Sequence, residues 1–178
     1  MSKTNIQKFT ITLDITLRIL SVGFIWWNPF IGLFTNSFLD AIDGDILARI
    51  GVRRKWYQPY DKFLDMWFYS AIFLYTVLYL SKDLVWIMIV VAFFVRLVGF
   101  VLYLLTKKEE MLFFFPGLSN TLFFIKIAFP FFFKINGIGI YPPLIFLLIL
   151  TFIKEWQLHV AKLDITHFYF PFIKAKEW

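Results

Sequence analysis

The 178-residue sequence has no cysteine and few charged residues. The lack of cysteine excludes disulfides, thiolate nucleophiles and cysteine-bound zinc or iron–sulfur clusters, but it leaves carboxylate chemistry with hard metal ions open. Charged residues make up 17% of the chain, whereas a soluble domain carries about a quarter. Together with a hydrophobic content of 60%, this scarcity of charge argues against a water-soluble globular protein.

Long hydrophobic runs occupy most of the chain. A membrane-spanning helix needs about 20 apolar residues, and windows of that length predict six spans near residues 9–27, 29–50, 60–80, 84–105, 111–133 and 141–160. Turn formers or charge clusters separate the spans. The sequence therefore predicts an all-α integral membrane protein in which residues 1–178 form a single membrane-embedded domain.

Basic residues fall mainly on one side of these predicted spans. Most of the lysines and arginines behind the net charge of +6 lie near the two termini, in residues 51–59 and in residues 106–110. Lys82 and Lys134 lie on the other side. By the positive-inside rule both termini are cytoplasmic, in the cell membrane. The basic residues alternate with apolar runs, so membrane lipids are the expected partner and nucleic acid is not.

Five aspartates stand in or beside two hydrophobic segments: Asp40, Asp43, Asp45, Asp61 and Asp65. Asp45 is expected to pair with Arg49, four residues later, and the other four form two pairs at helical spacing. Each charge near the bilayer centre costs at least about 2.5 kcal/mol, so the group needs compensation. Residues three or four apart share a helix face, which makes each pair point one way, and a short linker makes the two helices antiparallel neighbours. Oxygen ligands of this kind suit Mg²⁺, Mn²⁺ or Ca²⁺, and two ions could bridge a diphosphate. The alternative is that the aspartates cap helices or pair at the membrane interface with nearby basic side chains, namely Arg49, Arg53, Arg54 and Lys62.

The spacing of residues 40–65 resembles the signature of the CDP-alcohol phosphotransferases, D-x2-D-G-x2-A-R-x8-G-x3-D-x3-D. The positions that match it are Asp40, Asp43, Gly44, Asp61 and Asp65. Ala48 and Arg49 stand one residue later than the signature places them, and Tyr57 occupies the position of its second glycine. The six-span layout and Thr16-Leu17-Arg18 in the first span extend the resemblance weakly.

This resemblance implies an enzyme of phospholipid biosynthesis. It would transfer a phosphatidyl or phospho-alcohol group from a CDP-linked donor, expected to be CDP-diacylglycerol, to an alcohol acceptor and release CMP on the cytoplasmic side. The family also implies a homodimer and two Mg²⁺ or Mn²⁺ ions. The residues carried over are Asp40, Asp43, Asp61 and Asp65 as metal ligands, Asp65 also as general base, and Gly44, Ala48 and Arg49 around the CDP.

Other polar residues lie within the predicted spans. Arg96 and Lys126 stand near mid-span, where they could bind the phosphate of the donor or acceptor, or pair structurally with a carbonyl or an acid. Asp14 and Arg18, four residues apart, most simply pair with each other. Because Ala48 and Arg49 stand one residue later than in the family signature, a regular helix would rotate Arg49 by about 100° from its expected direction. If the protein is an active enzyme, we expect a π-bulge between Gly44 and Arg49 that restores this direction.

Two other functions remain open. Intramembrane aspartates also occur in the ion paths of cation transporters and channels, but such a path would distribute polar residues across the bilayer instead of gathering them at one face. The departures at Ala48, Arg49 and Tyr57 favour a catalytically inactive relative of the family.

Overall fold

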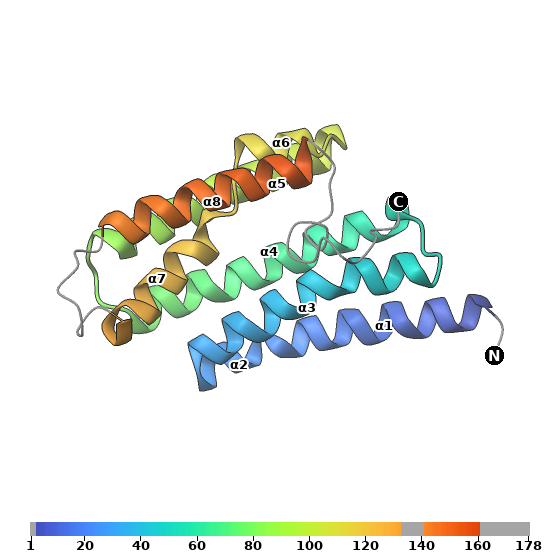
Figure 1. Ribbon diagram of the computed structural model, residues 1–178, viewed down its shortest axis with the longest axis horizontal. Coiled ribbons are helices and arrows are strands. Elements are labelled where there is room, and N and C mark those ends of the chain that lie inside the picture. The colour runs from blue at the N-terminus through green and yellow to red at the C-terminus, as the bar shows by residue number, and fades with distance from the viewer. Residues whose placement is uncertain (1–2, 133–140, 161–178) are drawn as a thin grey trace. The chain divides into compact units, whose positions relative to one another are not determined.

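The computed structural model describes residues 3–132 and 141–160, and every regular element within them is an α-helix (Figure 1). In chain order the helices are α1 (Lys3–Ser21), α2 (Gly23–Trp27), α3 (Pro29–Arg49), α4 (Arg54–Tyr79), α5 (Leu84–Thr106), α6 (Glu110–Phe114), α7 (Leu118–Phe132) and α8 (Tyr141–His159). The predicted all-α class is confirmed.

Each predicted hydrophobic segment coincides with helical structure, and two of them are interrupted. The first divides into α1 and α2 at Val22, whose carbonyl accepts a short-range bond from the Ile25 N–H at 3.1 Å. The fifth divides into α6 and α7 around Pro116. Proline lacks an N–H and disfavours helical backbone in the residue before it, which is why Phe115 leaves the helix.

Two helices are long and apolar enough to cross a membrane: Asn5–Trp27 and Leu84–Thr106. Within α7, the stretch Leu118–Ala128 is apolar but shorter than these two helices. Two of the six predicted spans therefore coincide with helices that have the length and composition needed to cross a membrane.

The chain divides into two compact units, with the boundary between Phe68 and Tyr69 inside α4. In the first unit α1 and α2 both pack against α3. Asn28 caps α3, accepting hydrogen bonds from the N–H groups of Phe30 and Ile31 at 3.0 and 3.2 Å, and Pro29 occupies the first helical position. This cap fixes the tight reversal between α2 and α3.

A glycine turn ends α3 and returns the chain as α4. Gly51 has a φ of 79°, which is the left-handed conformation that glycine adopts without strain. The N–H of Val52 donates to the carbonyl of Leu47 at 3.0 Å, the bond that defines a Schellman cap. Gln7 of α1 donates to the carbonyls of Ile50 and Gly51, each at 3.0 Å, and so ties this turn to the first helix.

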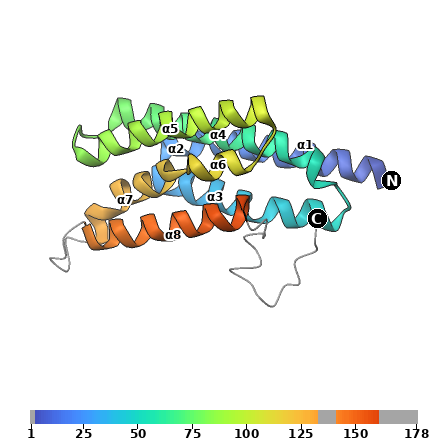
Figure 2. The same ribbon diagram turned by 90° about the horizontal axis from the view of Figure 1, so that it is seen from above.

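The second unit begins at Tyr69 and contains the end of α4 with α5 to α8. In it α5 packs against α6 and α7, and α8 packs against the same two helices (Figure 2). Phe73 stacks on Phe93 with ring centroids 4.5 Å apart, and Ile72 and Ile89 are fully buried.

Candidate metal centre

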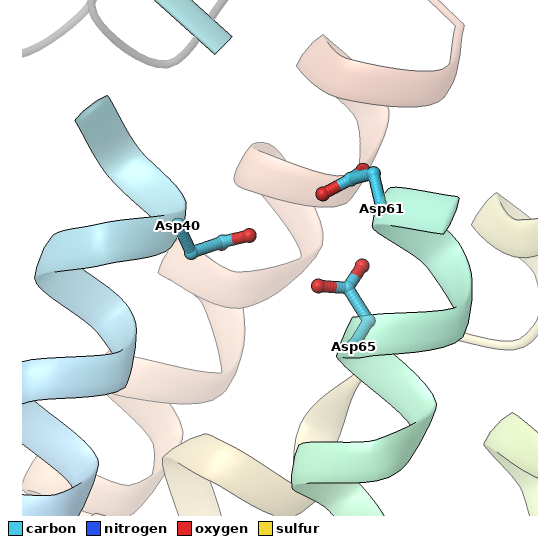
Figure 3. A group of neighbouring side chains, drawn as sticks. All are labelled: Asp40, Asp61 and Asp65. Atoms are coloured by element: carbon cyan, nitrogen blue, oxygen red, sulfur yellow. The ribbon is translucent and has the colours of Figure 1, made fainter. Parts of the chain in front are cut away.

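Carboxylates from α3 and α4 point into one space within the first unit (Figure 3). Asp40, Asp61 and Asp65 each offer an oxygen, and these oxygens all lie within 4.8 Å of one another. Asp43, one helical turn after Asp40, joins the group through a shared partner, Arg18. The helical spacing and the glycine turn thus bring the four aspartates together as the sequence predicts. They are called the acid cluster below.

The guanidinium of Arg18 lies at the centre of the acid cluster. Its Nη1 donates to Asp43 at 2.7 Å and to Asp61 at 2.8 Å. Its Nη2 donates to Asp40 at 2.9 Å and to Asp65 at 2.8 Å. The residue is only 1% exposed. One cation of α1 therefore neutralises part of the charge of four acids on two other helices.

The predicted pairing of Arg18 with Asp14 is wrong. Among the described residues, the ion pairs of Arg18 go to the acid cluster, and Oδ2 of Asp14 is buried without a hydrogen-bond partner. An i,i+4 pair contributes only about 0.3–0.5 kcal/mol, which is too little to hold an arginine against four converging carboxylates.

A lysine and a tyrosine of α4 complete the surroundings of the acid cluster. Lys62 Nζ lies 2.7 Å from Asp61 Oδ2 and 3.2 Å from Asp65 Oδ2. The hydroxyl of Tyr57 donates to Asp61 Oδ1 at 3.1 Å. Burial raises the pKa of Tyr57 well above its usual range, and the charges of Asp61 and Asp43 raise it further. Tyr57 therefore remains a protonated donor at neutral pH.

Exposure differs among the four acids. The side chain of Asp43 is 3% exposed and that of Asp61 is 9% exposed, whereas Asp65 reaches 16% and Asp40 reaches 28%. The open side of the acid cluster is therefore formed by Asp40 and Asp65.

The residues predicted to surround CDP are less well placed. Gly44 follows Asp43 on α3 and is half-buried, whereas Arg49 is exposed, and the side chain of Ala48 lies outside the described residues. Helix α3 is regular from Pro29 to Arg49, so the predicted π-bulge is wrong. At about 100° per residue, Arg49 lies about 180° around the helix from Asp40. The Schellman cap explains why α3 stays regular, because Arg49 is the last helical residue before the turn and the helix ends there without widening.

Arg96 and Lys126 both have partners within the second unit. Nη1 of Arg96 donates to the carbonyls of Leu112 and Phe115 at 3.1 and 2.9 Å and lies 3.3 Å from Glu155 Oε2. Lys126 donates to Ser81 Oγ at 2.9 Å and pairs with Asp83. These contacts are of the structural kind that the sequence left open beside phosphate binding.

Sequence reasoning named Lys62 among the possible partners of the aspartates, but it did not assign Arg18 or Tyr57 to the acid cluster. A signal was present for each of them. Arg18 is a cation in an apolar segment that must find an acid, Lys62 directly follows Asp61, and Tyr57 precedes Asp61 by one helical turn.

No protein-family model, curated protein or solved structure matches the chain. A proposal for its function therefore rests on the residues of the acid cluster and their geometry.

Proposed function

We propose that the chain is a membrane-embedded CDP-alcohol phosphotransferase that moves a phosphatidyl group from CDP-diacylglycerol to an alcohol and releases CMP. One observation carries the proposal: three carboxylates of α3 and α4, spaced as in the family signature, have oxygens within 4.8 Å of one another. The fourth acid of the signature, Asp43, contacts the same guanidinium as the other three.

The chemistry of the donor set fits hard divalent ions. Carboxylate oxygens are the ligands that Mg²⁺ and Mn²⁺ prefer, and no thiolate competes because the chain lacks cysteine. Asp40, Asp43, Asp61 and Asp65 would hold two such ions. When bound, they would neutralise charge on the diphosphate and on the departing CMP.

The acids of the cluster also supply the proton chemistry. Asp65 is the proposed general base, and its greater exposure compared with Asp43 leaves it accessible to an acceptor hydroxyl. The hydroxyl proton passes to Asp65 as the hydroxyl oxygen forms a bond to the phosphorus that carries diacylglycerol. The bond from that phosphorus to the bridging oxygen breaks, and CMP leaves with its electron pair. Such base catalysis contributes about 10²–10⁴-fold.

A bilayer is the proposed surroundings of the helices. On α5 an apolar stripe at helical spacing is largely exposed, with Ile87 at 53%, Val91 at 55%, Phe94 at 51% and Val98 at 49%. Contiguous apolar surface of this kind is unfavourable in water and suits lipid. We propose that all six hydrophobic segments lie in the bilayer. Both termini and the turn at residues 50–53 would then lie on the cytoplasmic side, as the distribution of basic residues predicts.

The test is CMP release by the purified full-length protein in lipid nanodiscs. The donor would be CDP-diacylglycerol labelled in the cytidine, offered with a panel of alcohols at millimolar Mg²⁺ or Mn²⁺. We expect CMP release that requires an alcohol and a divalent ion. Asp65→Asn should lower the rate by about 10²-fold or more, whereas Asp83→Asn, an acid outside the cluster, should leave it unchanged. Equal rates in the two variants would contradict the proposed base.

A catalytically inactive relative is the second candidate, and the regular end of α3 favours it. An exposed Arg49 about 180° from Asp40 does not face a nucleotide held by the acid cluster. If the wild-type protein neither releases CMP nor binds CDP-diacylglycerol with millimolar Mg²⁺ present, this second candidate replaces the enzyme.

A further inference from the structure

The carboxylate oxygens of the acid cluster already accept hydrogen bonds from the protein. Of the eight oxygens, Arg18 contacts four, one on each aspartate. Lys62 contacts the second oxygens of Asp61 and Asp65, and the N–H of Gly44 donates to the second oxygen of Asp43. An incoming cation therefore meets carboxylates of which at least seven of the eight oxygens accept a hydrogen bond within the described part of the chain.

Among the described side chains, the four carboxylates contact two cations, Arg18 and Lys62. These six groups together carry a formal charge of −2. One divalent ion would cancel that charge. A second ion would add positive charge next to the guanidinium unless an anionic diphosphate arrived with it.

The side-chain hydrogen bonds of Arg18 are made by its two Nη atoms. Both Nη atoms are bonded, whereas Nε is buried and has no hydrogen-bond partner in the described part of the chain. A buried donor without a partner is unfavourable. Among the described residues, the guanidinium therefore makes its hydrogen bonds to the carboxylates alone, and a cation that takes these oxygens would leave it without a hydrogen-bond partner.

We propose that Arg18 is the resident counter-cation of the acid cluster and that a divalent ion binds by displacing its guanidinium. This deepens the proposed function, because it rests on metal binding by the same four aspartates. Arg18 stabilises the cluster in the absence of metal and lowers its affinity for metal. Lys62 contacts only two of the acids and sits on the helix that carries them, so it remains in place.

The test compares Mn²⁺ binding by full-length variants in detergent at low salt, measured from the electron paramagnetic resonance signal of free Mn²⁺. Arg18→Met removes the charge, and Arg18→Lys keeps the charge but cannot bridge four carboxylates. Arg53→Met, an exposed arginine in the turn before α4, is the matched control. We expect Arg18→Met to bind Mn²⁺ about tenfold tighter or more than the wild type, Arg18→Lys to lie between, and Arg53→Met to match the wild type.

Thermal unfolding keeps the test informative if a variant is unstable. Without metal, both Arg18 variants should melt below the wild type because the acids repel one another, and Mn²⁺ should raise their melting temperatures by more than that of the wild type. If Arg18→Met does not fold even with Mn²⁺, Arg18→Lys decides between the outcomes. Wild-type or weaker Mn²⁺ affinity in Arg18→Lys overturns the proposal.

Failure of this inference is distinguishable from failure of the proposed function. If the wild type binds Mn²⁺ and releases CMP while the Arg18 variants show unchanged Mn²⁺ affinity, the counter-cation role is wrong and the enzyme stands. If the variants gain Mn²⁺ affinity while no protein releases CMP, the counter-cation role stands and the enzyme does not.

Discussion

The ion pair between Arg96 of α5 and Glu155 of α8 gives a sharp prediction for stability. The two residues are 3% and 4% exposed. Arg96→Met keeps much of the side-chain volume but removes the cation, leaving Glu155 with the N–H of Gly117 at 2.9 Å and with His159 at 3.1 Å. Removing one partner of a buried pair costs about 3–5 kcal/mol because the other charge stays buried without full compensation.

The magnitude converts to a measurable melting shift. For a chain of this size each kcal/mol corresponds to about 2–4 °C, so Arg96→Met should melt about 6–20 °C below the wild type in the same detergent. The assay is thermal unfolding followed by circular dichroism. Lys126→Met is the matched control, because its partner Asp83 is 51% exposed and exposed pairs contribute about 0–1 kcal/mol.

A double variant separates the charge effect from lost packing. Arg96→Met combined with Glu155→Gln leaves no uncompensated charge, so it should be less destabilised than the sum of the two single variants. A melting temperature for Arg96→Met within about 2 °C of the wild type, or strict additivity in the double variant, would show that the buried Arg96–Glu155 pair does not stabilise the fold in this way.

Three further predictions concern other parts of the chain. A Cβ at Gly32 would lie 2.5 Å from the backbone nitrogen of Ile25, so Gly32→Ala should destabilise by about 1–3 kcal/mol in denaturant titrations, whereas Gly23→Ala, with nothing within 4 Å, should be neutral or stabilising. Burial tends to raise the pKa of Asp83. The hydrogen bonds that its carboxylate accepts from Lys126 and from the N–H of Trp86, at the start of α5, outweigh this effect and lower the pKa. The Asp83 carboxylate therefore stabilises the fold at pH values above its unfolded pKa of about 3.9, and this stabilisation is lost as the pH falls through its folded pKa. The difference in melting temperature between wild type and Asp83→Asn should shrink between pH 6 and about pH 3. A cysteine at Lys82 should react with a membrane-impermeant thiol reagent in intact cells, and its protection would overturn the predicted topology.

Much of the helical architecture could be predicted, because long apolar runs and short polar linkers leave few alternatives. The break around Pro116 followed a visible signal, since proline cannot continue a helix and the residue before it avoids helical backbone. Gly51 was a local indication that α3 would end in a regular glycine cap. The family signature instead suggested a bulge before Arg49, and the structure has the glycine cap and a regular helix.

The acid cluster was only partly predictable. Spacing alone pairs Asp40 with Asp43 and Asp61 with Asp65, since helix geometry fixes which residues share a face. The position of Arg18 was not predictable in this way. Its nearest acid in sequence is Asp14, and the choice of partner depends on which face of α1 meets α3, a tertiary property that spacing within one helix does not contain.

We propose that the acid cluster is a divalent-ion centre for a CDP-linked substrate. The most direct measurement is the Mn²⁺ stoichiometry of the full-length protein by electron paramagnetic resonance, with and without CDP-diacylglycerol, in wild type, Asp61→Asn and Asp83→Asn. We expect the donor to raise the bound Mn²⁺ to about two ions per chain in wild type and Asp83→Asn, and we expect Asp61→Asn to lose most of this binding. Equal Mn²⁺ binding by Asp61→Asn and wild type, or no binding to either at millimolar Mn²⁺, would contradict it.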